Sequence, residues 1–153
     1  MTRARLLIVH HTTSPSLHTM LEAVREGAGA EGLEEVEVVT AAALSCTAAD
    51  ALGADGYVIV TPANLGTMAG AMKHFFDTIY YPCLEETRGR PFGCAVHGNS
   101  DVDGALRDTG RITTGLGWVQ ATDHVRVLDS PDAEAREVCW NLGATVAATL
   151  LEG

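Results

Sequence analysis

The chain has 153 residues, a hydrophobic fraction of 46% and a formal net charge of −10. This length supports one hydrophobic core, so we expect residues 1–153 to form a single domain. The ten Lys and Arg residues are scattered, which argues against nucleic acid as a partner, and the acidic balance fits solubility or a basic protein partner. Apolar runs are far shorter than the roughly 20 residues that span a bilayer, so we expect no membrane contact and a cytoplasmic location.

The cysteines and histidines show no metal-binding pattern. No pair of cysteines has C-x-x-C spacing and no H-x-x-x-H pair exists, so neither a zinc site nor dithiol chemistry is predicted. Cys94 lies in an apolar run and Cys139 on a helical face, so both are expected to be small core residues.

Short apolar runs alternate with segments of helical periodicity along the chain. Leu6–Val9 is short and continuously apolar, as expected for a strand buried on both faces. Leu17, Met20, Leu21 and Val24 then repeat at helical spacing. In chain order we expect a strand at 6–9, a helix at 17–28, a strand at 36–39, a short helix at about 47–52, a strand at 57–60, a loop at 61–68, a helix at 72–79, a strand at 92–96, a loop at 97–103, a helix up to 116, a strand at 125–128 and a helix from about 130 to 150.

Proline and glycine mark several expected boundaries. Pro82 disfavours a helical Tyr81, so the helix there should end at Tyr80-Tyr81-Pro82. Ser130-Pro131 resembles a cap followed by proline at the first helical position. Residues 27–32 fit G-x-G-x-x-G, but they follow a helix and precede a strand, the reverse of a dinucleotide site, so we interpret them as a helix-ending turn.

Five alternations of strand and helix predict a doubly wound parallel sheet with helices on both faces. Ligands of such sheets bind outside the carboxyl ends of the strands. The loops after the first, third and fourth strands are therefore the candidate site.

The first of these loops is rich in hydroxyl groups. Thr12, Thr13, Ser14 and Ser16 cluster where a helix begins, and the free N–H groups and dipole of a helix N-terminus favour an anion. No G-K-[ST] motif occurs, which excludes a nucleoside-triphosphate P-loop. An ordinary serine N-cap is the alternative interpretation.

The other two loops contain mainly uncharged groups. Residues 61–70 include two glycines and no charged side chain, which suits a flat ring system whose face Leu65 or Met68 can cover. An ordinary strand-to-helix connection is the alternative. The segment from His97 to Asp101 offers further donors, although Asp101 also fits an N-cap and His97 a structural hydrogen bond.

Two segments resemble the flavodoxin-like NAD(P)H-dependent FMN/quinone reductases, and specifically the WrbA-type flavoproteins. Residues 7–20 resemble their first strand, phosphate loop and helix. Residues 61–77 match T-P-x-x-x-G-x-M-x-G-x-x-K/R-x-F-x-D, which wraps the isoalloxazine in that family. The resemblance implies an α/β, flavodoxin-like, doubly wound five-stranded parallel sheet that binds FMN, with NADH or NADPH as electron donor.

The resemblance also implies roles for individual residues. No catalytic side chain is required, because FMN carries the chemistry, and His97 is only a candidate. Pro15 stands where the family usually has glycine; it removes one N–H donor and fixes φ. The implied groups are Thr12, Ser14, Ser16 and Leu17 for the phosphate, Pro62, Ala63, Asn64, Leu65, Gly66 and Met68 for the flavin, and His97, Gly98 and Asn99 for the pyrimidine or ribityl side.

The implied function is transfer of reducing equivalents from NAD(P)H via FMN to a quinone or similar acceptor. Two alternatives stay open: a flavodoxin-type electron carrier, and a flavodoxin-fold module that has lost FMN. Carriers commonly stack an aromatic side chain on the flavin, and neither candidate ring-binding loop contains one. A homodimer or homotetramer is the expected assembly.

Overall fold

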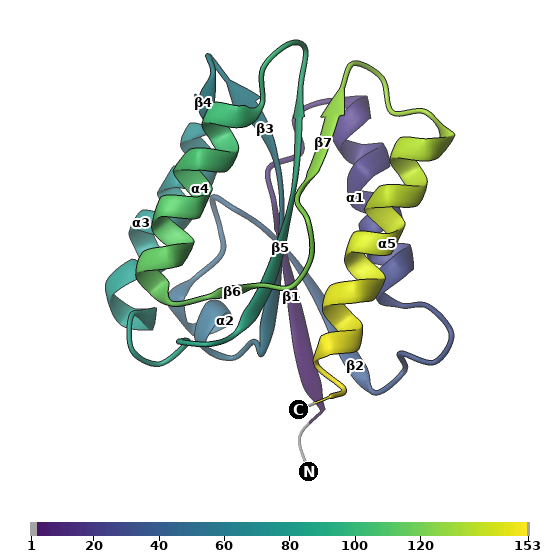
Figure 1. Cartoon of the computed structure of the whole chain (residues 1–153). Coiled ribbons are helices and arrows are strands. Elements are labelled where there is room, and N and C mark those ends of the chain that lie inside the picture. The colour runs from purple at the N-terminus through teal and green to yellow at the C-terminus, as the bar shows by residue number, and fades with distance from the viewer. Residues whose placement is uncertain (1–2, 153) are drawn as a thin grey trace.

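The computed structural model describes residues 3–152. A central sheet stands between two helical layers, with α3 and α4 on one face and α1 and α5 on the other (Figure 1). The elements are β1 (Ala4–His10), α1 (Pro15–Ala28), β2 (Val36–Ala42), α2 (Ala48–Leu52), β3 (Gly56–Asn64), β4 (Thr67–Met68), α3 (Gly70–Cys83), β5 (Pro91–Gly98), α4 (Asp103–Leu116), β6 (Val119–Gln120), β7 (Val125–Leu128) and α5 (Ala133–Thr149).

The main sheet is parallel and has the order β2-β1-β3-β5, which confirms the predicted flavodoxin-like fold. The fifth position of the sheet, beside β5, is shared by two short strands. Strand β6 pairs with the start of β5, and β7 pairs with the end of β5. The predicted strand at 125–128 is β7. Sequence periodicity missed β6 because it is only two residues long and both are exposed.

Continuous apolar strands are explained by a core on each face of the sheet. Leu6 and Ile8 of β1 pack with residues of α1 and α5, whereas Leu7 and Val9 pack with residues of α3 and α4. Successive side chains of a strand point to opposite faces, so a strand covered on both sides has no polar position.

All four cysteines are free and buried, as expected for Cys94 and Cys139. Burial raises the pKa of the Cys94 thiol to about 12. None of the helices within residues 3–152 is long and apolar enough to cross a bilayer.

Helices α1 and α5 touch through their backbones. A Cβ on Gly27 would lie 1.9 Å from the Trp140 carbonyl oxygen, and one on Gly143 would lie 2.1 Å from that of Val24. Helix α1 ends at Ala28, and Gly32 has a φ of 94°, which confirms the helix-ending turn. These glycines therefore serve helix packing and chain reversal.

Two expected helix boundaries are wrong. Helix α3 continues through Pro82 to Cys83, because Ile79 and Cys83 are fully buried and core packing outweighs the local preference before proline. Helix α5 begins at Ala133 and not near Ser130, because the Asp132 carboxylate accepts the Ala135 N–H at 2.8 Å and acts as the N-cap.

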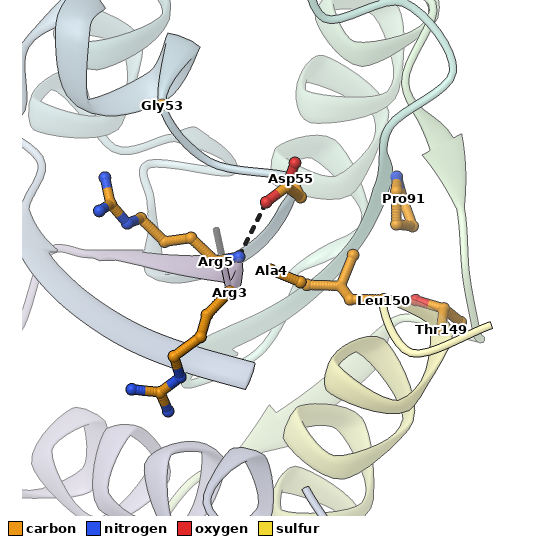
Figure 2. Close-up of a pocket in the computed structure, with 8 residues that line it drawn as sticks. All are labelled: Arg3, Ala4, Arg5, Gly53, Asp55, Pro91, Thr149 and Leu150. Atoms are coloured by element: carbon orange, nitrogen blue, oxygen red, sulfur yellow. Dashed lines mark hydrogen bonds between the residues drawn. The ribbon is translucent and has the colours of Figure 1, made fainter. Parts of the chain in front are cut away.

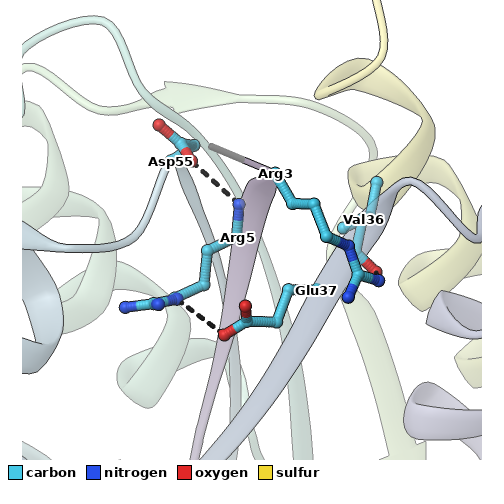
Figure 3. A network of polar contacts seen from close by, with 5 residues as sticks. All are labelled: Arg3, Arg5, Val36, Glu37 and Asp55. Carbon is cyan, nitrogen blue, oxygen red and sulfur yellow. Dashed lines mark hydrogen bonds and ion pairs between the residues drawn. The ribbon is translucent and has the colours of Figure 1, made fainter. Parts of the chain in front are cut away.

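A polar network joins the amino ends of the strands (Figure 3). The backbone N–H of Arg5 donates to Asp55 at 2.8 Å, and its guanidinium pairs with Glu37 at 3.0 Å. Arg3 donates to the Glu34 carbonyl at 2.7 Å. These contacts bind β1 to β2 and to the segment before β3, although their exposure limits what each contributes to stability.

Candidate functional site

The three candidate loops lie at one edge of the sheet, because β1, β3 and β5 are neighbours and their carboxyl ends point the same way (Figure 1). The backbone N–H of His11 donates to the Val60 carbonyl at 3.0 Å. Pro62 of β3 lies opposite His97 of β5 in the parallel register. The segments around 11–16, 61–68 and 97–99 are thus adjacent in space.

The first loop ends in a capped helix. The hydroxyl of Ser14, the N-cap of α1, accepts the Leu17 N–H at 3.2 Å, so its own hydrogen is available to another group. Pro15 occupies the first helical turn, where backbone N–H groups have no intrahelical partner, and the missing N–H costs the helix nothing. The Leu17 side chain is buried in the core, and Ser16 is half-buried.

A histidine supports this loop from the last position of β1. Nδ1 of His10 lies 2.9 Å from the Thr12 hydroxyl oxygen. Burial, and to a lesser degree the neighbouring charges of His11 and Arg25, lower the pKa of His10 below its ordinary value. His10 is therefore mainly neutral at neutral pH in the free protein.

The second segment is a hairpin and not the loop expected at 61–68. Strand β3 continues to Asn64, turns through Leu65 and Gly66, and returns as β4, which pairs Ala63 with Met68. Leu65 has a φ of 52° and Gly66 one of 77°, as in the type I′ turns that join twisted strands. The two-residue turn keeps residues 63–64 paired with residues 67–68 inside the expected loop.

The hairpin is held against α4. A Cβ on Gly104 would lie 1.8 Å from the Gly66 carbonyl oxygen, so the two backbones are in contact. The Met68 N–H donates to the Asp108 carboxylate at 3.0 Å. Sequence reasoning missed Asp108, because its partner is 40 residues away and no local pattern marks it.

Strand β5 also runs further than expected, to Gly98, because β7 pairs with its last residues. Nε2 of His97 lies 2.7 Å from the Asp129 carbonyl oxygen, and the Asp129 N–H donates to the Gly98 carbonyl at 3.1 Å. A Cβ on Gly98 would lie 2.8 Å from the Val102 side chain and 3.8 Å from Cβ of Ala63. His97 thus links the end of β5 to Asp129, the residue that follows β7. Asn99, directly after β5, is exposed.

A hollow of about 560 Å³ lies at the opposite end of the sheet (Figure 2). Its lining includes Arg3, Arg5 and Asp55 at the amino ends of the strands and Leu150 after α5. It is remote from the three loops. Within residues 3–152, no group of three or more His, Cys, Asp or Glu side chains is arranged to hold a metal ion.

A family model described as NADPH-dependent FMN reductase matches residues 31–130, about two thirds of the chain. The chain belongs to the NADPH-dependent FMN reductase family. The match includes the hairpin and the end of β5 but begins after the first loop. This membership confirms the resemblance seen in the sequence.

Flavodoxins are also relatives of this reductase-family chain. The flavodoxin of Aquifex aeolicus (strain VF5) is 33% identical over 91 residues, which is 60% of this chain and 48% of the relative. The match thus spans about half the length of that curated relative.

Solved structures confirm the fold of this FMN reductase family member. A flavodoxin from the domain Archaea superimposes with a TM-score of 0.82 at 18% identity, covering 96% of this chain and 99% of the other. A WrbA-like flavodoxin from Agrobacterium tumefaciens gives 0.80 at 20% identity, covering 97% and 98%.

The donor set fits FMN, which joins a phosphate to a flat uncharged ring system. Hydroxyl groups of Thr12, Ser14 and Ser16 gather at a helix N-terminus, where an anion is favoured. The adjacent hairpin from Ala63 to Met68 has no charged side chain. One end of the site thus suits a phosphate and the other suits a ring.

Proposed function

We propose that this protein is an FMN-binding oxidoreductase that passes reducing equivalents from NAD(P)H to a quinone or similar acceptor. The observation that carries the proposal is the meeting of a hydroxyl-rich helix N-terminus with an uncharged hairpin at the carboxyl ends of β1, β3 and β5. The family's name supports NADPH as the electron donor.

In this proposal Thr12, Ser14 and Ser16 hold the phosphate. The hairpin lines the flavin through Pro62, Ala63, Asn64, Leu65, Gly66 and Met68, while His97, Gly98 and Asn99 close the remaining side. Bound FMN supplies the electron-transfer chemistry, and the protein orients it and excludes water. His97 acts by holding the connections beside the cofactor, because its Nε2 is engaged with a main-chain carbonyl.

The first test is the visible spectrum of the purified protein, before and after addition of FMN and removal of the excess. We expect flavin absorbance to remain with the protein and the loaded protein to oxidise NADH or NADPH in the presence of quinones. A colourless protein that cannot be loaded would contradict the cofactor assignment.

A matched pair of variants sharpens this test. Ser16→Ala removes one hydroxyl from the phosphate end, and we expect about tenfold weaker FMN binding, because a hydrogen bond to a charged group contributes about 1.5 kcal/mol. Ser45→Ala changes an exposed serine in the connection after β2 and should bind FMN like the wild type.

A second candidate function is that of a flavodoxin-type electron carrier, which the flavodoxin relative favours. A redox titration of the FMN-loaded protein separates the two. Two well-resolved one-electron steps would favour the carrier, whereas one two-electron step would favour the reductase.

Pro15 motivates a third candidate, a flavodoxin-fold module without cofactor. Excess FMN would then leave the melting temperature unchanged, because only a ligand that binds the folded state raises it. A homodimer or homotetramer stays the predicted assembly, and sedimentation measures it.

A further inference from the structure

The proposed phosphate site has an unbalanced charge. A phosphomonoester carries about −1.5 to −2 charges near pH 7, whereas the N-terminus of a helix supplies about half a positive charge. The loop at 11–16 contains no Lys or Arg. A cation near the loop would therefore strengthen phosphate binding, and His10 is the titratable group in contact with one of its hydroxyls.

The contact between His10 and Thr12 gives the imidazole a route to the anion. When Nδ1 carries a proton, it donates to the Thr12 hydroxyl oxygen 2.9 Å away. The Thr12 O–H must then donate elsewhere, and the adjacent helix N-terminus is where the phosphate is proposed to lie. A protonated His10 thus both supplies charge and orients the hydroxyl.

The surroundings of His10 disfavour its protonated form in the free protein. Burial opposes its charge, and so do His11 beside it and Arg25 of α1, which itself pairs with Glu22 at 2.9 Å. The strand residues opposite it, Ala42 of β2 and Val60 of β3, are uncharged. The one carboxylate among these neighbours, that of Glu22, is paired with Arg25, so none of them favours a protonated ring in the free protein.

We propose that His10 is the cation that faces the FMN phosphate, and that it takes up a proton when the phosphate binds. This inference rests on the proposed function and specifies the charge balance of the same site.

The sign of the pH dependence follows from linkage. In this proposal phosphate binding raises the pKa of His10. The gain in affinity is therefore complete at pH values below the pKa of His10 in the free protein. It disappears as the pH rises through the pKa of His10 in the complex. Each unit of increase corresponds to about a tenfold gain in affinity. The phosphate itself titrates near pH 6, so measurements above about pH 7 isolate the histidine.

The first experiment compares FMN with riboflavin, which lacks the phosphate, between pH 7 and pH 9. For the wild type we expect the FMN dissociation constant to rise several-fold over this range and that of riboflavin to rise less. His10→Asn keeps a donor near Thr12 without a titratable ring, and it should bind FMN more weakly at pH 7 with a flatter profile. The control His74→Asn, at an exposed position of α3, should follow the wild type.

Direct titration of the intact protein avoids any folding defect of a variant. We expect NMR of the imidazole C–H resonances to show a higher pKa for His10 with FMN than with riboflavin. An equal pKa in both, or a His10→Asn variant with the wild-type pH profile, would overturn this inference alone. Failure of the wild type to bind FMN at any pH would overturn the proposed function with it.

Discussion

At Leu65 local backbone preference and structure disagree. It has a φ of 52° and a fully exposed side chain, so burial does not offset its left-handed backbone. That conformation costs a residue with a Cβ about 1–2 kcal/mol. Strain of this kind is typical of functional sites, and it is consistent with a leucine whose partner, the proposed flavin ring, is present only in the complex.

The variant Leu65→Asn tests this interpretation. Asn-Gly is the preferred type I′ pair, so we expect the FMN-free protein to be more stable by about 1 kcal/mol in urea unfolding. FMN binding should weaken, because the apolar contact is lost. The control Leu44→Asn makes the same exchange at an exposed position without a positive φ, and neither quantity should change. A less stable Leu65→Asn protein would contradict the strain argument.

At the level of elements, the contact of α1 with α5 depends on glycine. A Cβ at position 143 would lie 2.1 Å from a backbone oxygen of α1, which cannot move without separating the helices. The same helix pair covers the sheet beneath the first candidate loop. Its packing therefore supports both the core and the position of the α1 N-terminus.

We expect Gly143→Ala to lower the free energy of unfolding by about 1–3 kcal/mol, as overpacking does. Gly110→Ala is the matched control, because this glycine lies in α4 and a Cβ added to it would have no neighbouring atom within 4 Å. The free energy of unfolding of this control variant should rise by about 0.5–1 kcal/mol, because alanine has a higher helix propensity than glycine. Equal urea midpoints for the two variants would show that the helices separate without cost.

At the level of the whole molecule, we expect two half-buried histidines to make stability depend on pH. Burial is the main cause that lowers the pKa of His10 and of His124, whose Nδ1 is buried without a hydrogen-bond partner among the described residues. A lowered pKa in the folded state contributes stability that is present above the ordinary value of 6.5 and is lost as the pH falls through the folded-state value.

The urea concentration at the unfolding midpoint of the FMN-free protein should therefore decrease as the pH is lowered from 7 to 5. Combining His10→Asn with His124→Asn should flatten this part of the profile, whereas His18→Asn, at an exposed position, should leave its slope unchanged. A double variant with the wild-type slope would assign the pH dependence to other groups.

The amino-acid sequence by itself determined the kind and order of the main elements. Continuous apolar runs such as Leu6–Val9 indicated strands covered on both faces, and helical spacing in between implied the doubly wound sheet. The motif at 61–77 indicated the family. These features were readable because each lies within one short stretch of chain.

Only the tertiary structure decided how the candidate site is built. Met68 bonds to Asp108, and His97 to Asp129, across 40 and 32 residues respectively. Neighbouring elements extended β5 to Gly98 and carried α3 past Pro82, against local signals. The physical reason is the same in each case: the decisive energy comes from burial and pairing with distant parts of the chain, which no local pattern encodes.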